Sequence, residues 1–405
     1  MAKTLYLFSY VTSRHRLCNL TFFFFLALTL AACKKDTDDP VPDPVYLIES
    51  EIIAELSSDD IRTFLDENVF PSDLAFLVRN DILVYKIVYQ TIDTDNMPVL
   101  ASGALLVPVP DGSTPLPLIS FQHGTITSDE DAPSNFRAEN YFVAAIYSSA
   151  GFIIALPDYL GYGSSSHLPH PYEHGNSLAT ASRDMLRAVK EFDRENNNFT
   201  ANDKLFLTGY SEGGYATMAL LKLLEQEHRD EFTITATTVG SGAYNKSEFA
   251  RAILEKDEEL THLNTFLWVL DTYNNIYNIN RSAGQIYNAP YSGIIEDDGV
   301  FANSQLNPQI LLTNEFRNGF LSGTDQEFID ALADNDNYDW KPLTPLQLYH
   351  GTEDDFVFYL NSETAYEAMT SKGANHVELI TIEGGDHTTS VFDYFTGSFI
   401  FFNQF

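Results

Sequence analysis

The sequence is poor in cysteine and in positive charge, and both shortages restrict what the protein can do. It has two cysteines in 405 residues, and it has 23 lysines and arginines against 57 aspartates and glutamates, so its formal net charge is −34. Two cysteines cannot supply the several disulfides of a small secreted scaffold or the thiolates of a structural zinc site. A surface this acidic repels the phosphates of nucleic acid. We therefore expect no nucleic-acid partner and no thiolate metal centre.

The rest of the composition is that of an ordinary globular protein. Hydrophobic residues make up 44% of the chain and charged residues 20%, which excludes a disordered chain. A chain of 405 residues can bury a large core, and its length alone would allow two or three domains. The order of the segments has to decide the architecture.

The first 45 residues have the pattern of a targeting segment. Arg14 and Arg16 precede an apolar run of roughly a dozen residues, which is too short to span a bilayer comfortably. The run ends in Leu-Ala-Ala-Cys, which resembles the lipobox of bacterial lipoproteins, where the cysteine is acylated and becomes the mature N-terminus. This resemblance implies a signal peptide at 1–32, lipid attachment at Cys33 and a flexible tether at 33–45. A plain secretory signal with a chance cysteine is the alternative.

These features predict an extracytoplasmic protein that a lipid anchor holds at a membrane. Cys18 lies in the segment that cleavage removes and Cys33 carries the lipid, so no cysteine pair is left to form a disulfide. The tether is acidic after two lysines, which resembles the surface-export signals of some Gram-negative lipoproteins. We expect the outer membrane or cell surface of a Gram-negative bacterium, and no protein partner is implied.

After the tether, a helical pattern gives way to strands and then to strands that alternate with helices. Residues 46–69 show helical spacing of apolar residues with acids on the other face. The later alternation of short apolar runs with amphipathic stretches predicts an α/β fold with a mostly parallel sheet covered by helices on both faces. Strands are expected within 82–92, 99–109, 116–124, 151–158, 204–209, 233–242, 345–351 and 376–385, and helices within 139–150, 177–196, 215–228 and 390–402.

One long segment, 243–341, interrupts this alternation. At about a hundred residues it is too long for a structureless connection in a compact domain. Leu263, Phe266, Leu267 and Leu270 follow the spacing i, i+3, i+4, i+7 of an amphipathic helix. We therefore expect a mostly helical cap that covers the open end of the sheet with apolar surface.

Ser211 lies in Gly-Tyr-Ser-Glu-Gly, between a predicted strand and a predicted helix. The pattern G-x-S-x-G occurs by chance in chains of this length, and its neighbours make it informative. A nucleophile elbow places its serine on a strained turn between strand and helix, and the glycines let neighbouring elements approach closely. The context predicts Ser211 as a nucleophile, with the amide of Glu212 at the helix N-terminus as a donor to an oxyanion.

A serine hydroxyl needs a base to activate it and an acid to orient that base. The chain order Ser, acid, His leads to residues 350–357, which resemble the motif H-G-x-x-D-x-x-V and place the acid at Asp354. The adjacent Asp355 is the alternative. His387 follows the last predicted strand after two glycines, in the position expected for the base.

The loop after the predicted strand at 116–124 is the expected source of a second oxyanion donor. Its His123-Gly124 pair resembles an H-G oxyanion motif, which implies the main-chain amide of Thr125 as the donor and a turn-shaping role for His123. The histidines at 167, 170 and 174 suggest a metal site at first sight. The prolines between them prevent a helix that would align the rings, so we expect no metal.

With these motifs in this order, residues 74–405 resemble the α/β-hydrolases, and within them the secretory-lipase branch and bacterial prolyl-oligopeptidase-like relatives. The resemblance implies a single domain at 46–405 with a cap insert at about 243–341, a Ser-His-Asp triad and an acyl-enzyme intermediate. It implies a lipase or esterase that cleaves small-molecule or glycan-linked carboxylic esters without a cofactor. The alternatives are a serine peptidase, which usually carries a large N-terminal gate, and a binding protein that has lost catalysis.

Overall fold

The computed structural model describes residues 46–67, 72–110, 114–137, 141–195 and 199–405. The predicted signal peptide, Cys33 and the tether lie outside these residues. Contacts divide the chain into Met1–Asp43 and Pro44–Phe405, and every described residue belongs to the second part. Within this part of the chain, no helix has the length and apolar character needed to cross a membrane.

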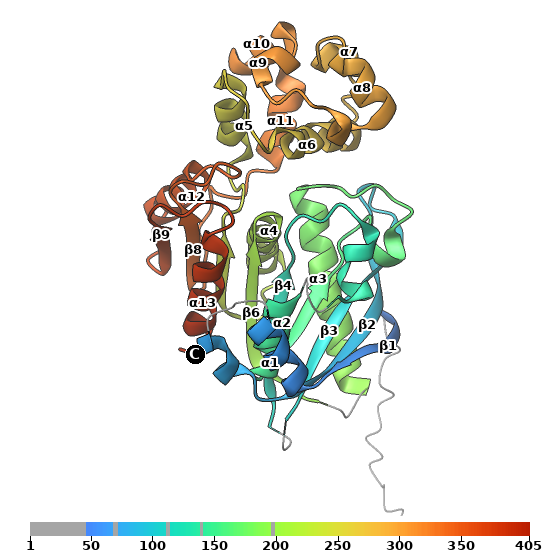
Figure 1. The fold of residues 1–405 in the computed structure, drawn as a ribbon, viewed down its shortest axis with the longest axis vertical. Helices are drawn as coiled ribbons and strands as arrows, with labels where there is room; N and C mark the ends of the chain where they lie inside the picture. The colour runs from blue at the N-terminus through green and yellow to red at the C-terminus, as the bar shows by residue number, and fades with distance from the viewer. Residues whose placement is uncertain (1–45, 68–71, 111–113, 138–140, 196–198) are drawn as a thin grey trace, which may run out of the picture. The chain divides into compact units, whose positions relative to one another are not determined.

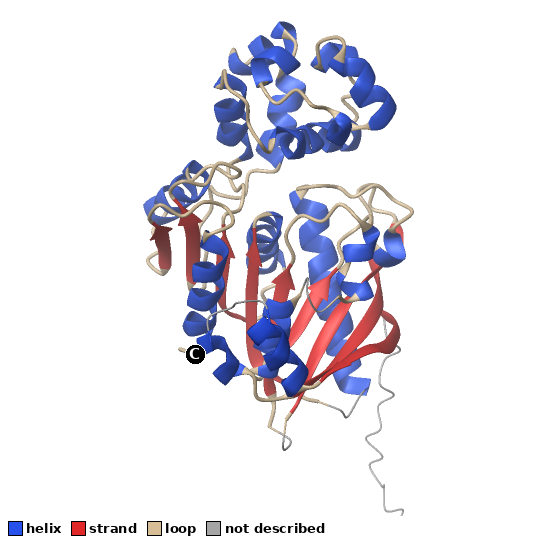
Figure 2. Cartoon of the chain, in the orientation of Figure 1, coloured by secondary structure: helices blue, strands red, loops and turns tan. Residues whose placement is uncertain are grey.

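A nine-stranded sheet forms the centre of the described residues (Figures 1 and 2). Its strand order is β1-β2-β3-β5-β4-β6-β7-β8-β9. The pairs β1–β2, β2–β3 and β3–β5 are antiparallel, and all pairs from β5–β4 to β8–β9 are parallel. The strands are Leu47–Leu56 (β1), Asp81–Ile92 (β2), Pro98–Val109 (β3), Leu116–Gln122 (β4), Ile153–Pro157 (β5), Ala201–Tyr210 (β6), Ile234–Gly240 (β7), Leu346–Gly351 (β8) and Val377–Ile382 (β9).

Helices cover both faces of this sheet, which confirms the predicted fold class (Figure 1). Side chains of α3, α4 and α12 pack with one face in a single apolar core, and those of α1, α2 and α13 form the core of the other face. These helices are Ser58–Glu67 (α1), Phe142–Ser149 (α2), Gly175–Glu195 (α3), Glu212–Glu227 (α4), Leu360–Ser371 (α12) and Ser390–Phe402 (α13); short 3₁₀ helices lie at Ser72–Leu77, Asp129–Asp131, Pro133–Asn135, Gly163–Ser165 and Val300–Ala302.

The prediction of one helix over 46–69 was wrong, because the segment begins with strand β1. This strand pairs with β2 at the edge of the sheet, where Leu47 lies opposite Tyr89. Helix α1 begins only after Ser57, whose Oγ accepts from the Asp60 N–H (3.1 Å) while Asp60 Oδ2 accepts from the Ser57 N–H (3.2 Å). Such a reciprocal cap starts a helix at its own position, so the strand before it is free to pair with β2.

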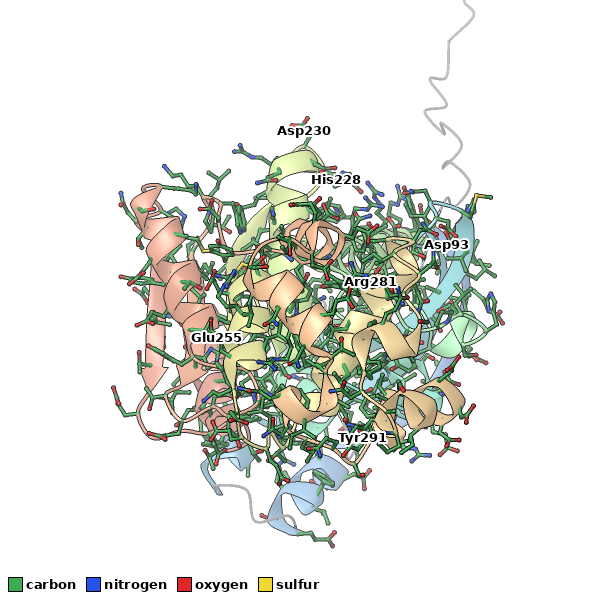
Figure 3. All side chains as sticks on the ribbon, turned by 90° about the horizontal axis from the view of Figure 1, so that it is seen from above. Asp93, His228, Asp230, Glu255, Arg281 and Tyr291 are labelled. Atoms are coloured by element: carbon green, nitrogen blue, oxygen red, sulfur yellow. The ribbon has the colours of Figure 1, made fainter. Side chains whose placement is uncertain are left out.

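Between β7 and β8 the chain forms seven helices with an apolar core of their own. The four residues of the predicted stripe in α6 are all buried in this core. Arg281, labelled in Figure 3, belongs to the same insert, and its guanidinium pairs with the buried Asp325 and with Glu327 (3.2 Å). The helices are Lys246–Glu255 (α5), Leu263–Ile276 (α6), Ala283–Ile286 (α7), Tyr291–Asp298 (α8), Pro308–Leu311 (α9), Asn314–Leu321 (α10) and Gln326–Asp334 (α11).

Polar contacts join this insert to the loop that precedes α3. Lys246 at the start of α5 forms a buried ion pair with Glu173. The Tyr273 hydroxyl of α6 donates to the Glu173 carbonyl (2.7 Å), and the Gly175 N–H donates to Asn335 Oδ1 just after α11 (2.9 Å). Because a buried charge that loses its partner is costly, these contacts hold the insert against the loop.

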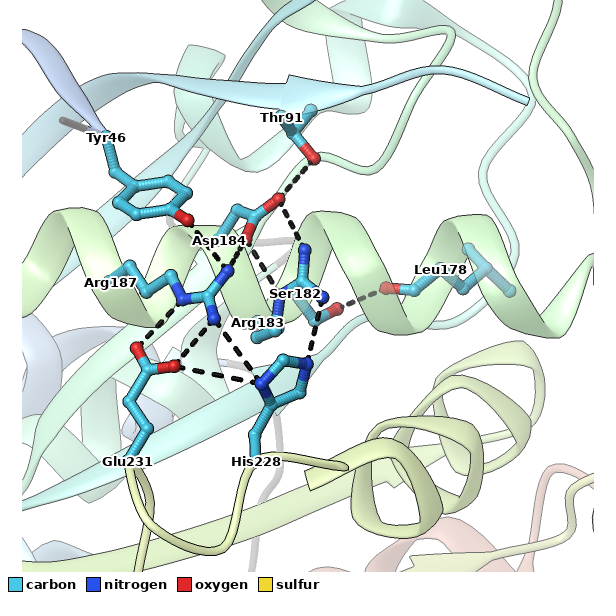
Figure 4. Close-up of polar contacts among 9 residues, drawn as sticks. All are labelled: Tyr46, Thr91, Leu178, Ser182, Arg183, Asp184, Arg187, His228 and Glu231. Atoms are coloured by element: carbon cyan, nitrogen blue, oxygen red, sulfur yellow. Dashed lines mark hydrogen bonds and ion pairs between the residues drawn. The ribbon is translucent and has the colours of Figure 1, made fainter. Parts of the chain in front are cut away.

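Farther along α3, a polar cluster joins the helix to β2 and to the loop after α4 (Figure 4). Asp184 is buried and accepts from Thr91 Oγ1 (2.8 Å), Arg183 Nε (2.9 Å) and Arg187 Nη1 (2.9 Å). Arg187 also binds Glu231 through two hydrogen bonds of 2.8 and 2.6 Å. The two guanidinium groups neutralise the buried Asp184 carboxylate, so removing them would leave an uncompensated buried charge.

Candidate active site

Ser211 is the single residue between strand β6 and helix α4. Its backbone has φ 61° and ψ −125°. A non-glycine residue in such a conformation costs on the order of 1–3 kcal/mol, and it persists only where the surroundings impose it. The Ser211 N–H donates to the Gly240 carbonyl of β7 (2.9 Å), and the Ser211 carbonyl accepts from the Tyr215 N–H (3.0 Å). The strained turn is therefore held from both sides.

The two glycines of the motif allow the close packing that this turn needs. A Cβ atom at Gly209 would lie 2.3 Å from the carbonyl oxygen of Gly213. A Cβ atom at Gly213 would lie 2.1 Å from the carbonyl oxygen of Gln122 in β4. Both distances are shorter than any real contact of that kind, so a larger residue at either position would push α4 away from the sheet.

His387, in the loop between β9 and α13, links Ser211 to a carboxylate. Its Nε2 lies 3.0 Å from Ser211 Oγ, and its Nδ1 lies 2.8 Å from Asp354 Oδ2. Asp354 Oδ2 can only accept, so Nδ1 carries a proton and Nε2 of the neutral ring is free to accept from the serine. The arrangement places an imidazole of defined tautomer beside the Ser211 hydroxyl.

Asp354 is buried in a turn after β8 and is surrounded by donors. Its Oδ1 accepts from the N–H groups of Phe356 (3.1 Å) and Val357 (2.8 Å). Burial raises the pKa of Asp354, whereas hydrogen bonds from His350 and His387 lower it by a larger amount. The pKa of Asp354 is therefore well below the usual range. The carboxyl group is therefore ionised across the neutral pH range and attracts the positive charge that His387 gains on taking a proton.

His350, the first residue of the predicted acid motif, contacts this turn from strand β8. It is fully buried, and its Nε2 donates to the Val357 carbonyl (2.7 Å) while its Nδ1 accepts from the Ser362 hydroxyl (2.7 Å). The same Nε2 lies 3.4 Å from Asp354 Oδ2. Asp355, the alternative acid, is exposed. The structure thus brings Asp354, and not Asp355, to His387.

One predicted oxyanion donor begins helix α4, and the other lies in the loop after β4. Glu212 is the first residue of α4, so its N–H has no partner within the helix. A Cβ atom at Gly124 would lie 3.8 Å from Ser211 Cβ, which shows how close the loop after β4 comes to Ser211. Thr125 follows in that loop, and its Oγ1 lies 2.9 Å from the hydroxyl oxygen of Tyr172.

Tyr172 connects this loop to the helical insert, a contact that the sequence did not reveal. Its ring stacks on Trp268 of α6 with 4.2 Å between ring centroids and 2° between ring planes. The two residues are far apart in sequence and belong to different elements, so no local pattern announces the pair. Tyr172 thus contacts both Trp268 of α6 and the side chain of Thr125.

The side chain of Glu212 is buried and contacts His170, one of the three closely spaced histidines. Glu212 Oε1 lies 2.8 Å from His170 Nε2, and His170 Nδ1 donates to the Leu160 carbonyl (2.7 Å). His174 instead contacts Ser177 Oγ (3.0 Å). In the described part of the chain, no three His, Cys, Asp or Glu side chains are grouped so that they could hold a metal ion.

Two hollows meet at Ser211. On the insert side lies a small cavity of about 30 Å³, lined mainly by apolar residues of α5, α6 and the turn after Asp354. On the other side lies an open hollow of about 530 Å³ between the Thr125 loop, the start of α2 and α13. Ser211 therefore borders both spaces.

Comparison with known proteins agrees with this geometry. The trichothecene C-3 esterase of Fusarium sporotrichioides is 24% identical over 376 residues, which cover 85% of this chain and 80% of that protein. A Legionella pneumophila protein assigned to the hydrolases has a solved structure that is 28% identical, with a TM-score of 0.80 over 89% of this chain and 98% of that one. The rice cell wall degrading esterase LipA of Xanthomonas oryzae shares the fold, with 24% identity and a TM-score of 0.74 over 89% of this chain and 96% of its own.

A family model covers the elbow, the insert, the acid turn and the histidine loop together. It is that of the secretory lipases, and it matches residues 130–396, which is well over half of the chain. With this match, the protein belongs to the secretory lipase family and is a carboxylic ester hydrolase.

Proposed function

We propose that the protein hydrolyses its ester substrate with Ser211, His387 and Asp354, through an acyl-enzyme intermediate. Ser211 Oγ attacks the carbonyl carbon while His387 Nε2 takes the serine proton. The N–H groups of Glu212 and Thr125 hold the oxyanion that forms. The observation that carries this proposal is the hydrogen-bonded chain from Ser211 through His387 to Asp354.

The second half of the reaction uses the same groups in reverse roles. When the tetrahedral intermediate collapses, the bond to the alcohol oxygen breaks and His387 gives its proton to that oxygen. Water then attacks the acyl-enzyme, His387 takes a proton from the water, and Ser211 regains it as the carboxylic acid leaves. No cofactor takes part in these steps.

We infer neutral acyl esters as substrates, including esters carried by small molecules or glycans. The cavity and hollow beside Ser211 are mainly apolar, and the chain is too acidic to attract polyanions. The two relatives named for their substrates, a trichothecene esterase and a cell wall degrading esterase, suit this class. Among the described residues, no particular contact favours the two alternatives, a serine peptidase and a binding protein that has lost catalysis.

We also propose the arrangement of the whole chain. Residues 1–32 would be a signal peptide, 33–45 a tether that begins at the lipidated Cys33, and 46–405 the catalytic domain with its cap at about 243–341. Secretory-family membership supports an extracytoplasmic location, and the lipobox-like sequence supports the outer membrane or cell surface. Incorporation of labelled palmitate into the wild type and its loss in Cys33→Ser would support the anchor. Equal labelling of both would refute it.

The decisive experiment for the chemistry compares Ser211→Ala with the wild type on 4-nitrophenyl acetate and butyrate. We expect turnover to fall by about 10⁴-fold or more, because the other triad residues cannot act without the nucleophile. A fluorophosphonate probe should label the wild type and leave Ser211→Ala unlabelled. Ser371→Ala, at an exposed serine of α12, is the matched control and should keep both activities. Retained turnover in Ser211→Ala would refute the assignment.

A further inference from the structure

The first turn of helix α4 carries the proposed oxyanion donor, the N–H of Glu212, and contains two glycines. Gly213 and Gly214 follow Glu212, and they have no side chain through which a neighbouring element could orient the turn. The peptide unit between Ser211 and Glu212 is held at its carbonyl end, because the Ser211 carbonyl accepts from the Tyr215 N–H (3.0 Å). The Glu212 side chain is therefore in a position to fix the other end.

The Glu212 side chain is buried and is held by one histidine. It is 1% exposed, and its Oε1 lies 2.8 Å from Nε2 of His170, whose side chain is 3% exposed. Within the described part of the chain, Glu212 Oε2 has no hydrogen-bond partner. Among these residues, the contact with His170 is therefore the one polar contact that fixes the Glu212 side chain.

This contact is a hydrogen bond only if the two side chains share a proton. His170 Nδ1 lies 2.7 Å from the Leu160 carbonyl oxygen, which can only accept, so Nδ1 carries a proton. A neutral ring in that tautomer would set Nε2, an acceptor, against an ionised carboxylate. His170 and Glu212 therefore hold one further proton between Nε2 and Oε1. Breaking this bond would leave two buried polar groups unsatisfied, which is costly.

His170 is itself held in place by its neighbours. A Cβ atom at Gly161 would lie 2.4 Å from His170 Cα, so the two stretches of backbone are in close contact. The imidazole ring lies 4.7 Å from the ring of Tyr162 and 5.6 Å from that of Trp268, measured between centroids. The loop after β5 and helix α6 thus fix the ring that bonds to Glu212.

His170 can act on the oxyanion donor without touching the substrate. In the part of the chain that the structure describes, His170 lines neither of the two spaces that Ser211 borders. An oxyanion donor has to lie about 2.7–3.1 Å from the oxygen in the transition state, so a small shift of the donor weakens its bond. The Glu212 N–H is bonded directly to the Cα that carries the Glu212 side chain, so a movement of that side chain moves the donor.

We propose that His170 is a positioning residue of the reaction. Its hydrogen bond to the Glu212 side chain fixes the first turn of α4, and with it the N–H group that holds the oxyanion. The proposal rests on the proposed function, because it requires the Glu212 N–H to be an oxyanion donor. It gives the buried pair a part in stabilising the transition state, in addition to its part in packing.

Two substitutions at His170 separate this role from a purely structural one. In His170→Asn, the side-chain NH₂ takes the place of Nδ1 and can still donate to the Leu160 carbonyl, but no atom reaches Glu212. In His170→Gln, the longer side chain brings its NH₂ close to the place of Nε2 and can donate to Glu212 Oε1, but the Leu160 carbonyl loses its donor. A structural role predicts similar effects for both variants, because each loses one buried hydrogen bond.

The measurements are kcat and KM for 4-nitrophenyl acetate and the inhibition constant of trifluoroacetophenone. Ser211 Oγ adds to the carbonyl carbon of this ketone, the serine proton passes to His387, and the carbonyl oxygen becomes an oxyanion that needs the same N–H groups. We expect His170→Asn to lower kcat about 10- to 100-fold, which is part of the loss that follows removal of an oxyanion donor. The inhibition constant should rise by a similar factor, and KM should change by less than about threefold. His170→Gln should keep a kcat at least about fivefold above that of His170→Asn.

His174→Asn is the matched control, because it makes the same change at a buried histidine of the same loop. His174 is 6% exposed and His170 8%, and His174 contacts Ser177 instead of Glu212. This variant should leave kcat and the inhibition constant unchanged. Circular dichroism and complete labelling by a fluorophosphonate measure the amount of folded enzyme in every sample, so that kcat refers to competent sites.

Equal losses of kcat in His170→Asn and His170→Gln overturn the proposal, and so does a loss of kcat that leaves the inhibition constant unchanged. If His170→Asn does not fold, Glu212→Met breaks the same contact with an apolar side chain of similar length and has to change both values in the same way; an unchanged kcat there overturns the proposal. If the His170 variants match the wild type while Ser211→Ala is inactive, the positioning role fails and the triad stands. If the wild type hydrolyses no ester, both fail.

Discussion

Replacing Asp354 by Asn should abolish most of the activity, and the structure indicates how. In the native turn, Oδ1 accepts from the Phe356 and Val357 N–H groups while Oδ2 faces His387 Nδ1 and His350 Nε2. An asparagine would keep its oxygen at the two N–H groups, because turning it around would set the amide NH₂ against two donors. The NH₂ group would then face His387.

This orientation reverses the tautomer of His387. Nδ1 would have to accept from the amide, so the proton would move to Nε2, the atom that must accept from Ser211. A base in the wrong tautomer cannot take the serine proton, and a change of this kind costs about 10⁴-fold in turnover in a serine protease. The fold should survive, because the two backbone hydrogen bonds to Oδ1 are kept.

The assay is the steady-state hydrolysis of 4-nitrophenyl butyrate at pH 7.5 by Asp354→Asn and Asp355→Asn. We expect a loss of about 10³- to 10⁴-fold in kcat for Asp354→Asn. For Asp355→Asn we expect a change of less than about threefold, because its side chain is exposed and surface substitutions have small effects. A larger loss at Asp355, or a loss of less than tenfold at Asp354, would refute the reasoning.

Two further predictions follow from contacts around the site. Thr125→Val and Tyr172→Phe each break the hydrogen bond between the Thr125 and Tyr172 hydroxyls, and each should lower kcat about 2- to 10-fold. The double variant should lose no more than the worse single variant, because both remove the same hydrogen bond. Additive losses would show that this hydrogen bond is not the cause. Burial lowers the pKa of His174 from 6.5 to about 4. As the pH decreases, the unfolded chain therefore protonates this histidine before the folded chain does. The free energy of unfolding should fall as the pH decreases from about 6.5 to about 4. In urea unfolding at pH 7 and pH 4.5, His174→Gln should lose about 2–3 kcal/mol less than the wild type, and equal losses would exclude His174 as a source of the acid sensitivity.

Much of the fold could be predicted because its signals are local. The parallel strands are short apolar runs that glycine, proline or aspartate ends, and α3 has a long amphipathic pattern, so both appear in a window of ten to twenty residues. The prediction for residues 46–69 failed because the spacing of their acidic residues is compatible with a helix as well as with a strand. The Ser57-x-x-Asp60 cap was present in the sequence and would have divided it correctly.

The three residues of the site could be predicted from the sequence, apart from the choice between Asp354 and Asp355. The contacts that surround these residues could not. Ser211 and His387 follow strand ends at positions that chain order defines, whereas Asp354 and Asp355 are adjacent and only the backbone turn decides which carboxyl group points inward. The pair of Glu212 with His170 joins residues far apart in the chain. No spacing rule predicts such a contact, because it depends on how the loop before α3 folds back over the elbow.

The place where the insert joins the sheet has a consequence for how such enzymes can diverge. β7 and β8 are paired parallel neighbours, with Gly240 opposite Tyr349, so the insert forms the crossover connection between two adjacent strands. Ser211, Asp354 and His387 all lie on the sheet side of that junction. Residues can therefore be gained or lost within the seven helices without shifting the register of any strand. Away from its contacts with Tyr172 and Glu173, the insert can thus change while the strands that carry the three residues keep their places.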